Sequence, residues 1–512
     1  MIYIIGSGLS GVAAAAALVQ RGCRPTILDA GLTPDSVARM LKARMACAEP
    51  EDWSKDDVAL LKRIGPPAPS GIPRKLHFGS WFPYRDVDPA TSANVERASM
   101  HRSFALGGFS NVWGAVTQAL PDREFTSWPI TPPELAPHYA AARALLADGS
   151  GPRASSQART FYRDLAGSRR ELERRGIRFG YPDLAVRTAD DPGGKGCRYC
   201  GLCLYGCPYD AIYNAGSTLA RLIQEGRVGY LPRVIVDRLS PERGRVRIEA
   251  RSLADGSSGT LEGGRVFVAA GLLETARIIL NSLALYDTAL SVQHSDIFTL
   301  PILRFDAEGD VARERLHTLC QLVVEIEDGA ICRYPVRLQL YGYNDLYPQL
   351  LERRAGRLAR PLDRALRAMS ARLFIAFGYL HSDVSSRIRV TLSGREPAKL
   401  RLQGEPNPEA RRIGRAVAQK LLRASRHLRA VAVPFQLRLD LPGGGYHTGG
   451  SFPMSRAPAA LETDRWGSLS SLPGIHLVDA SVLPSVPAAA LALTVMANSH
   501  RIASECPLPH AE

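Results

Sequence analysis

Four cysteines lie close together near the middle of the chain, in the segment CRYCGLCLYGCP. Cys197, Cys200, Cys203 and Cys207 follow the spacing C-x2-C-x2-C-x3-C, and a proline comes directly after the last one. Thiolates on one short loop suit a compact iron–sulfur cluster, whereas structural zinc usually takes two ligand pairs about a dozen or more residues apart. We therefore predict these four residues as ligands of an iron–sulfur cluster, with zinc as the less favoured alternative.

The same segment resembles the cluster-binding run of bacterial ferredoxins, and it continues into YDAI much as such runs do. In ferredoxins with two clusters, the fourth cysteine of a run binds the other cluster. This chain has a single run among its nine cysteines. The fourth ligand of a [4Fe–4S] cluster is therefore either Cys207 or a remote residue such as Cys320 or Cys332.

A glycine-rich loop near the N-terminus indicates a second chemistry, the binding of a dinucleotide. The apolar run Ile2 to Ile5 leads into GSGLSG, which is followed by an alanine-rich helix and a strand ending at Asp29. In such a unit Gly6 permits a tight turn, Gly8 lets a pyrophosphate approach the backbone, and Gly11 allows the helix to pack on the strand. Asp29 stands where an acidic side chain accepts hydrogen bonds from ribose hydroxyls. The loop alone does not separate FAD from NAD.

The length of the chain and the order of its predicted elements indicate two lobes and an insert. The 512 residues exceed the roughly 250 to 300 that one hydrophobic core usually supports. The first βαβ unit, later strands at 228–250 and 263–270, and a final strand and helix predict an α/β, Rossmann-like lobe that is discontinuous in sequence. We expect this lobe to comprise residues 1–195, 214–290 and 441–512, the insert to comprise 196–213, and a second, sheet-containing lobe to comprise 291–440.

Several segments resemble the glucose–methanol–choline (GMC) oxidoreductases. HTGGSFPM, which begins at His447, and the following stretch with HLVDASVLP resemble the family's closing region, where a histidine motif precedes a strand ending in D-A-S-x-x-P. FALGGFSNVWGAV at 104–116 resembles the glycine-rich stretch that contacts the flavin, and WPITPPELAPHYAAA resembles a segment of the sugar and polyol dehydrogenase branch. RVFVAAGLLETARIILNS, which turns at Gly271, resembles the family's turn from strand to helix.

This resemblance implies bound FAD and an antiparallel sheet in the second lobe that covers the substrate pocket. It also implies that Asp479 and Ala480 lie near the ribityl chain and the isoalloxazine end of the cofactor, and that the backbone of Val234 contacts adenine. Further flavin-contacting positions implied by the motifs are Gly107, Gly108, Asn111 and Gly271.

His447 is the residue that the resemblance implies as the catalytic base. Oxidation of an alcohol requires removal of the hydroxyl proton while a hydride leaves the carbon, so we expect a base with a pKa near neutrality above the flavin. The alternative is a histidine that only forms hydrogen bonds within the turn GGGYHTGG. The family has a second His or Asn after D-A-S-x-x-P, but Ala490 occupies that position here. Because a methyl group forms no hydrogen bond, Tyr446, Ser451 or Asn498 would have to replace this partner.

Some dehydrogenase subunits of the family carry a C-x5-C-x3-C insert that binds [3Fe–4S], and Cys197, Cys203 and Cys207 match it. The additional Cys200 favours [4Fe–4S]. A cluster would accept electrons one at a time from reduced FAD, so O2 would not be the only electron acceptor. We therefore predict a dehydrogenase that oxidises an alcohol group of a sugar or polyol and passes electrons to a ferredoxin, cytochrome or quinone. The alternatives are a ferredoxin-fed flavin reductase acting on a carbonyl or alkene, and an electron-transfer subunit without substrate chemistry of its own.

The chain carries a formal net charge of +14 and has a basic segment, residues 353–372, with seven arginines. A basic amphipathic helix can lie on an anionic membrane, which would suit a lipid-linked substrate or a quinone. A surface helix with one solvated face, kinked at Pro361, is the favoured interpretation. Nucleic acid is not an expected partner, because no zinc-finger or RNP-type motif is present. The clustered cysteines and the lack of a signal peptide or a long apolar run predict a reducing, cytoplasmic location.

Overall fold

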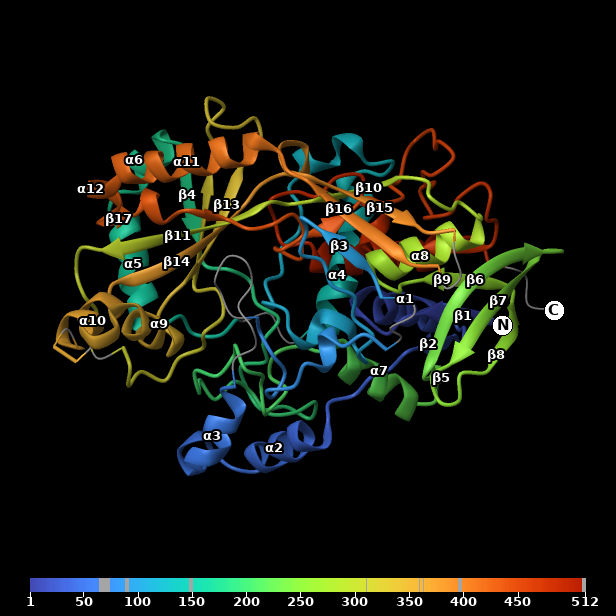
Figure 1. Ribbon diagram of the computed structural model, residues 1–512, viewed down its shortest axis with the longest axis horizontal. Helices are drawn as coiled ribbons and strands as arrows, with labels where there is room; N and C mark the ends of the chain where they lie inside the picture. Colours follow the sequence, from blue (N-terminus) through green and yellow to red (C-terminus); the bar gives the residue numbers. More distant parts are fainter. Residues whose placement is uncertain are drawn as a thin grey trace.

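The computed structural model describes residues 1–63, 74–87, 92–146, 151–309, 311–358, 360–361, 363–394 and 398–508. Its described elements form two lobes that lie side by side (Figure 1). The first lobe contains a parallel sheet and the second an antiparallel sheet. Within the described residues, no helix is long and apolar enough to cross a membrane.

The parallel sheet brings together strands from distant parts of the chain. Its order is β20 (Ile475–Leu477), β9 (Arg265–Val268), β1 (Ile2–Ile5), β2 (Thr26–Asp29) and β5 (Gly229–Pro232). Helices α1 (Leu9–Gln20) and α13 (Ala492–Glu505) pack together beside this sheet, and the Ser499 hydroxyl donates to the Ser10 carbonyl at 2.6 Å. The alanines of α1 are buried, which permits this close packing. The prediction of a discontinuous Rossmann-like lobe is confirmed.

The second lobe is built on a seven-stranded antiparallel sheet. Its strands are β4 (Ile177–Gly180), β11 (Ile297–Arg304), β12 (Leu322–Ile326), β13 (Val336–Tyr341), β14 (Leu373–Tyr379), β17 (Ala430–Ala432) and β18 (Arg438–Leu439). Helices α5 (Ser156–Gly167) and α11 (Pro408–Arg423) contribute buried apolar residues to the same core, among them Phe161 and Val417. The antiparallel sheet implied by the family resemblance is therefore present.

Two segments differ from the expected lobe boundaries. β4 lies within residues 1–195 but pairs with β12 of the second lobe. Conversely, β15 (Arg387–Leu392) and β16 (Leu400–Glu405) join β10 (Leu290–His294), β19 (Thr448–Gly449) and β3 (Asn94–Glu96) in a five-stranded sheet that shares the core of the first lobe. Alternation of apolar residues predicts a strand but does not indicate which sheet the strand joins. The lobe boundaries predicted from the sequence therefore differ from those of the structure.

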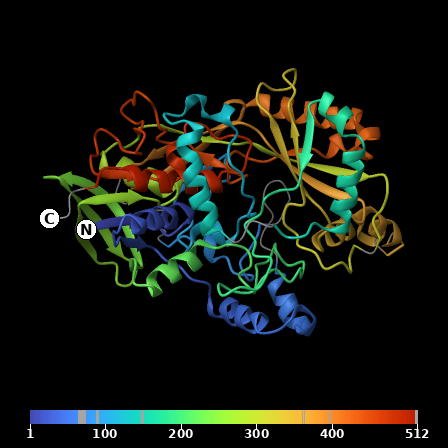
Figure 2. The ribbon, with the colours of Figure 1, turned by 180° about the vertical axis from the view of Figure 1, so that it is seen from behind.

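The remaining elements surround these sheets. A three-stranded antiparallel sheet of β6 (Val234–Glu242), β7 (Arg245–Ser252) and β8 (Ser258–Gly263) packs against α8 (Leu272–Ser282). α4 (Pro132–Leu145) crosses α13, and the Tyr139 and Thr494 hydroxyls lie 2.9 Å apart (Figure 2). The other helices are α2 (Ser36–Ala46), α3 (Lys55–Leu61), α6 (Arg169–Arg174), α7 (Ala215–Gln224), α9 (Leu346–Ala355), α10 (Asp363–Ser370) and α12 (Ser425–Leu428).

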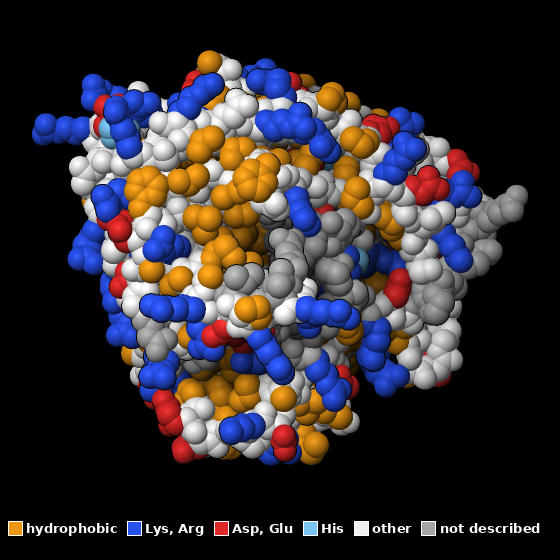
Figure 3. All heavy atoms as spheres, turned by 60° about the vertical axis from the view of Figure 1, so that its left-hand side comes forward, with side chains coloured by type: hydrophobic (Ala, Val, Ile, Leu, Met, Phe, Trp, Pro, Cys, Tyr) orange, Lys and Arg blue, Asp and Glu red, His pale blue; other side chains and the backbone are white. Residues whose placement is uncertain are grey.

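The basic segment contributes the end of α9 and all of α10 rather than one continuous helix. In α10, Leu366 and Met369 are half-buried, and Arg367 pairs with Asp363 at 2.9 Å. On this side of the molecule, Lys and Arg side chains surround a group of apolar side chains near the middle of the face (Figure 3).

Candidate active site

A cavity of about 470 Å³ opens at the carboxyl ends of the parallel strands and extends to the sheet of the second lobe. This edge of an open α/β sheet is where such folds bind their ligands. The predicted site residues that line it are Gly6, Gly8, Asp29, Gly108, Val234, Gly271, His447, Asp479 and Ala480. Three other predicted positions, Gly11, Gly107 and Asn111, do not line the cavity. The structure thus brings together residues that lie more than 470 positions apart in the sequence.

The glycine loop between β1 and α1 has the geometry that a dinucleotide requires. Gly6 has φ of +98°, and a Cβ there would lie 2.4 Å from the Ala269 carbonyl oxygen. A Cβ on Gly11 would lie 2.1 Å from the Gly6 carbonyl oxygen, so Gly11 serves helix packing rather than ligand contact. A Cβ on Gly8 would meet no atom within 4 Å, which leaves the backbone open to the cavity at the N-terminus of α1.

Asp29 ends β2 and presents its carboxylate to the cavity. The Ser7 hydroxyl donates to its Oδ2 atom at 2.5 Å, and the Tyr230 hydroxyl donates to the same atom at 3.2 Å. Burial raises the pKa of Asp29 to about 6, while these hydrogen bonds favour the ionised form. The carboxylate is thus fixed in position and retains capacity to accept a hydrogen bond from a ligand hydroxyl.

Asp479 holds the turn from β9 to α8 against the C-terminal segment. Its Oδ2 atom accepts hydrogen bonds from the Gly271 amide at 2.9 Å and the Thr275 hydroxyl at 2.5 Å. Burial raises the pKa of Asp479, and the hydrogen bonds from Ser481 and Thr275 oppose that effect. The Asp479 side chain therefore fixes the position of Gly271. Both residues line this edge of the cavity.

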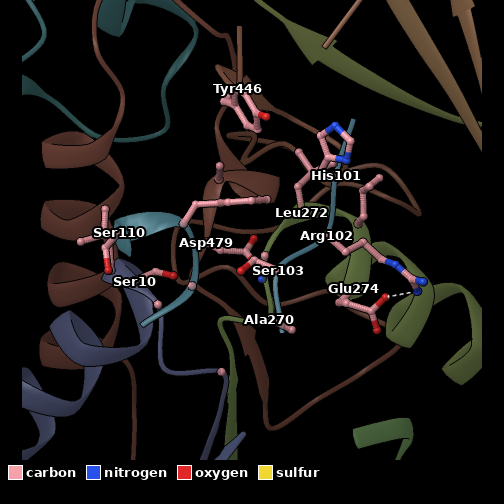
Figure 4. Close-up of a pocket in the computed structure, with 18 of the residues that line it drawn as sticks. Ser10, His101, Arg102, Ser103, Ser110, Ala270, Leu272, Glu274, Tyr446 and Asp479 are labelled. Carbon is pink, nitrogen blue, oxygen red and sulfur yellow. Dashed lines mark hydrogen bonds and ion pairs between the residues drawn. The ribbon is translucent and has the colours of Figure 1, made fainter. Parts of the chain in front are cut away.

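A buried ion-pair network that the sequence did not predict lies in the wall of the cavity. Glu274 accepts a hydrogen bond from Arg102 at 2.8 Å (Figure 4). It accepts a second one from Arg277, also at 2.8 Å. Burial opposes ionisation of Glu274, but the two guanidinium groups outweigh it and hold its pKa below the ordinary value. Glu274 of the ETAR motif therefore joins α8 to the irregular segment around Arg102, and Arg277 joins it to Asp237 of β6, contacts that sequence spacing could not indicate.

Gly107 and Asn111 shape the turn beside the cavity. Gly107 has φ of +79°, and a Cβ there would lie 2.7 Å from Asn214 Oδ1. The Asn111 amide donates to the carbonyls of Leu106 at 2.9 Å and Gly108 at 2.7 Å. The Asn111 amide is therefore committed to the backbone of the turn, and the contact of Asn111 with a flavin stays a prediction.

His447 lies at the second-lobe end of the cavity, stacked on the Tyr379 ring with centroids 4.5 Å apart. Its Nδ1 atom has no hydrogen-bond partner among the described residues. Burial lowers the pKa of His447 to about 4. The expectation of a pKa near neutrality is thus wrong for this structure, because burial disfavours the imidazolium and no carboxylate in the described ranges acts on it.

Ala490 lines the cavity, so no second imidazole or amide enters from that position. Of the three residues considered as replacements, Tyr446 lines the cavity, whereas Ser451 and Asn498 do not. The Asn498 side-chain oxygen Oδ1 instead accepts hydrogen bonds from Arg501 at 2.9 and 3.1 Å. Tyr446 has φ of +58° and stacks with His101 at one end of the cavity (Figure 4).

The sheet of the second lobe supplies polar groups that sequence reasoning missed. Gln339 and Tyr341 on β13 and Tyr379 on β14 all line the cavity. The Tyr341 hydroxyl donates to Gln339 Oε1 at 3.0 Å. Their alternation in VRLQLY indicates a shared face of one strand, but the ligand that this face would meet depends on how the lobes pack.

The four cysteines of the insert line a second, smaller cavity of about 20 Å³, together with His317 and Leu319. All four thiols are free and partly buried. The Tyr199 amide donates to Cys197 Sγ and the Thr318 amide to Cys203 Sγ, each at 3.4 Å. Convergent thiols with amide donors fit a cluster-binding loop. His317 was not predicted, and no spacing motif links it to the cysteines.

The remote candidates for a fourth ligand do not line this thiol-lined cavity. The Cys320 thiol donates to the Leu322 carbonyl at 3.3 Å, and Cys332 belongs to the core of the second lobe. Over the described ranges, no group of three or more His, Cys, Asp and Glu side chains is arranged to hold a metal ion. Burial also raises the pKa of Cys197 to about 12. The cluster therefore remains a prediction, with Cys207 as its local fourth ligand.

Comparison with protein families matches two segments of the chain. Residues 4–34 match the family described as NAD(P)-binding Rossmann-like domain, and residues 385–499 match the family described as GMC oxidoreductase. The C-terminal segment of the chain is therefore similar to GMC oxidoreductases. The matched C-terminal segment includes His447, Asp479 and Ala490. A search of curated proteins finds no match.

A solved structure with a similar fold is that of pyridoxine 4-oxidase from Mesorbium loti. The match has a TM-score of 0.61, covers 98% of each chain and has 15% sequence identity. At this sequence identity the likeness shows that the two chains share a fold, and it shows nothing about shared chemistry.

Proposed function

We propose that this protein is an FAD-dependent oxidoreductase that oxidises an alcohol group, with His447 as the catalytic base. The observation that carries this proposal is the convergence of the glycine loop, Asp29, Asp479 and His447 on one cavity. When bound, FAD would supply the acceptor for a hydride from the alcohol carbon. The match of residues 385–499 to the GMC oxidoreductases supports the same reaction class.

The N-terminal half of the cavity has the donors and acceptors that the nucleotide part of FAD needs. The backbone at Gly8 and the N-terminus of α1 would bind the pyrophosphate. Asp29 would accept hydrogen bonds from ribose hydroxyls, and Val234 at the start of β6 would contact adenine. Asp479 would lie near the ribityl chain, held there by the Gly271 amide.

The opposite half of the cavity would hold the substrate. His447 is neutral at physiological pH because burial lowers its pKa, so a ring nitrogen is available to accept the hydroxyl proton. The same burial weakens the imidazole as a base, so the proton must be taken up as the hydride leaves. Stacking on Tyr379 fixes the orientation of the imidazole ring. We assign to the Tyr341–Gln339 pair the role of orienting the substrate oxygen, which Ala490 cannot perform.

The substrate proposed is a sugar, a polyol or another alcohol that can stack on an aromatic ring. Tyr446 stacks with His101 at a centroid distance of 6.2 Å and meets Phe109 edge-on at 5.6 Å. All three residues line the cavity. Such a surface suits the apolar face of a sugar ring or a flat aromatic ring.

We further propose that Cys197, Cys200, Cys203 and Cys207 hold a [4Fe–4S] cluster and that the enzyme is a dehydrogenase. The convergence of four thiols on one cavity supports this proposal, and the presence of Cys200 beside the other three favours four irons over three. A bound cluster would supply one-electron transfer to an external acceptor such as a ferredoxin, cytochrome or quinone.

The test is to purify the protein without air, quantify flavin and iron, and record anaerobic spectra before and after addition of sugars, polyols and aromatic alcohols. We expect bound FAD, about four irons per chain and bleaching of the flavin band by at least one alcohol. Flavin that is reduced only by reduced ferredoxin would favour the reductase alternative. Bound flavin that no alcohol or carbonyl compound oxidises or reduces would favour an electron-transfer subunit.

A further inference from the structure

The backbone of His447 is held by the segment that joins β10 to β11. The Ser295 amide donates to the His447 carbonyl at 2.9 Å. The next residue, Asp296, accepts a hydrogen bond at its own carbonyl from the Leu380 amide at 3.1 Å. Leu380 directly follows Tyr379, whose ring stacks on the His447 imidazole. One short segment therefore holds both members of this stacked pair.

Two titratable side chains of the same segment, His294 and Asp296, are buried together behind the large cavity. Each residue is only 1% exposed. His294 Nε2 lies 3.6 Å from Asp296 Oδ1, and neither atom has a hydrogen-bond partner within the described ranges. The other carboxylate oxygen, Oδ2, accepts hydrogen bonds from the Ser386 amide at 2.7 Å and the Ser386 hydroxyl at 2.8 Å. Ser386 therefore fixes the Asp296 carboxylate with its second oxygen beside the imidazole.

The hydrogen bond of the His294 imidazole determines which ring nitrogen carries the proton. Its Nδ1 atom accepts from the Gly443 amide at 3.4 Å. A ring nitrogen that accepts a hydrogen bond carries no proton, so the proton of the neutral imidazole lies on Nε2, beside Asp296. The carboxylate favours this tautomer because it attracts the Nε2 proton. Asp296 thus keeps Nδ1 available to hold the Gly443 amide.

The turn that begins at Gly443 leads directly into His447 and depends on its neighbours for its shape. A Cβ on Gly445 would lie 3.2 Å from Ile297 Cβ, so the turn packs closely on the start of β11. Tyr446 has φ of +58°, a conformation that a tyrosine keeps only where its surroundings hold it. Loss of the hydrogen bond at Gly443 would therefore let the turn shift and displace His447.

We propose that Asp296 and His294 are positioning residues for the base His447. Asp296 selects the His294 tautomer that binds the Gly443 amide, and this contact fixes the turn that presents His447 to the substrate. The inference rests on the proposed function, in which His447 is the base. Asp296 and His294 act through His447 alone, because neither of them lines the large cavity. Misplacement of a reacting group by about 1 Å can lower a rate about 100-fold, so a remote pair can control the reaction without affecting substrate binding.

The isosteric variant Asp296→Asn, purified with its flavin, tests the carboxylate. Its amide oxygen can still accept from Ser386, but its NH2 group would donate to His294 Nε2 and move the imidazole proton to Nδ1. At saturating alcohol we expect the rate constant of flavin reduction, measured by anaerobic stopped-flow spectroscopy, to fall about 10- to 100-fold. The apparent Kd of the alcohol and the FAD content should stay unchanged.

A second readout does not depend on activity. In Asp296→Asn the Gly443 amide should exchange with deuterium at least about tenfold faster, because it has lost its acceptor. Hydrogen-exchange mass spectrometry of the glycine turn measures this. Asp164→Asn is the matched control, since Asp164 accepts a hydrogen bond from Arg304 at 2.8 Å and lines neither cavity. It should leave the rate and the exchange of the turn at their wild-type values.

The variant His294→Asn separates the tautomer from the carboxylate. Its side-chain oxygen can take the place of Nδ1 and accept from the Gly443 amide, so we expect a rate close to that of the wild type. His294→Leu has no acceptor and should be as slow as Asp296→Asn. In the His294→Asn background no imidazole tautomer remains to be selected, so Asp296→Asn should have no further effect.

An unchanged rate or an unchanged exchange of the Gly443 amide in Asp296→Asn would overturn the proposal. An Asp296→Asn effect of equal size in the His294→Asn background would also overturn it, because Asp296 would then act independently of the imidazole. If Asp296→Asn does not fold, equal rates in His294→Asn and His294→Leu overturn the proposal, and a slower His294→Leu supports it. Wild-type flavin that no alcohol reduces would instead contradict the proposed function, so the two failures are distinguishable.

Discussion

The two cavities of this protein are built in opposite ways. The small cavity takes its four cysteines from eleven consecutive residues, so its chemistry can be seen in a short stretch of sequence. The large cavity takes its lining from β1, β2, β6, the turn before α8, the second-lobe sheet and the C-terminal segment. A local ligand set can therefore be predicted from spacing alone, whereas a site of dispersed residues exists only after the lobes have packed.

The two cavities also differ in the groups that line them. The large cavity is lined by the carboxylates of Asp29, Asp479 and Glu274, which accept hydrogen bonds from neighbouring donors. The small cavity is lined by four thiols. Fixed carboxylates suit a ligand rich in hydroxyl groups, whereas thiolates are ligands for soft metal ions.

The largest expected effect concerns the base of the large cavity. His447→Ala should lower the rate of flavin reduction by alcohol about 10²- to 10⁴-fold, since the variant has no group to accept the hydroxyl proton. FAD content and iron content should stay unchanged. Anaerobic stopped-flow spectroscopy measures the rate, and His427→Ala in α12, outside both cavities, is the control. A variant that reduces flavin at the wild-type rate would leave His447 with a structural role only.

The next effect concerns the ligand set of the small cavity. Cys207→Ser should lower the iron content from about four atoms per chain to three or fewer and reduce electron transfer to external one-electron acceptors. Flavin reduction by alcohol should persist, because Cys207 does not line the large cavity. Cys332→Ser, in the core of the second lobe, is the matched control. Loss of iron from Cys332→Ser but not from Cys207→Ser would contradict the local ligand set.

A smaller effect is expected from substitutions that distinguish the roles of two glycines in the same loop. Gly11→Ala should lower the free energy of unfolding by about 1–3 kcal/mol, because its Cβ would lie 2.1 Å from the Gly6 carbonyl oxygen. Gly8→Ala should leave the stability of the apoprotein unchanged but weaken FAD binding, since its Cβ would enter the open cavity. Thermal unfolding of the apoprotein and flavin titration measure the two effects. The reverse pattern would mean that Gly8 packs and Gly11 faces the ligand.

The smallest effect is a pH dependence that should be nearly flat. Because burial lowers the pKa of His447 to about 4, the neutral base is already present at mildly acidic pH. The rate of flavin reduction should therefore change little between about pH 5 and 8 and should fall only as the pH drops through about 4. An acid limb near pH 6.5 that disappears in His447→Ala would show that the imidazole has an ordinary pKa in the loaded enzyme.

The sequence alone determined the features that depend on short-range order. The glycine loop, the strand ending at Asp29 and the cysteine run predicted their own local structures, because turns and loops of this kind depend on residue type and spacing. The family motifs additionally indicated His447 and Asp479, both of which line the large cavity.

Only the tertiary structure decided which distant groups meet. It placed β4 in the second lobe, β15 and β16 in the core of the first, and the Arg102–Glu274 pair in the cavity wall. It also lowered the pKa of His447, because burial arises from packing across the whole chain. Residue spacing does not predict these contacts, because they join segments that lie up to hundreds of residues apart.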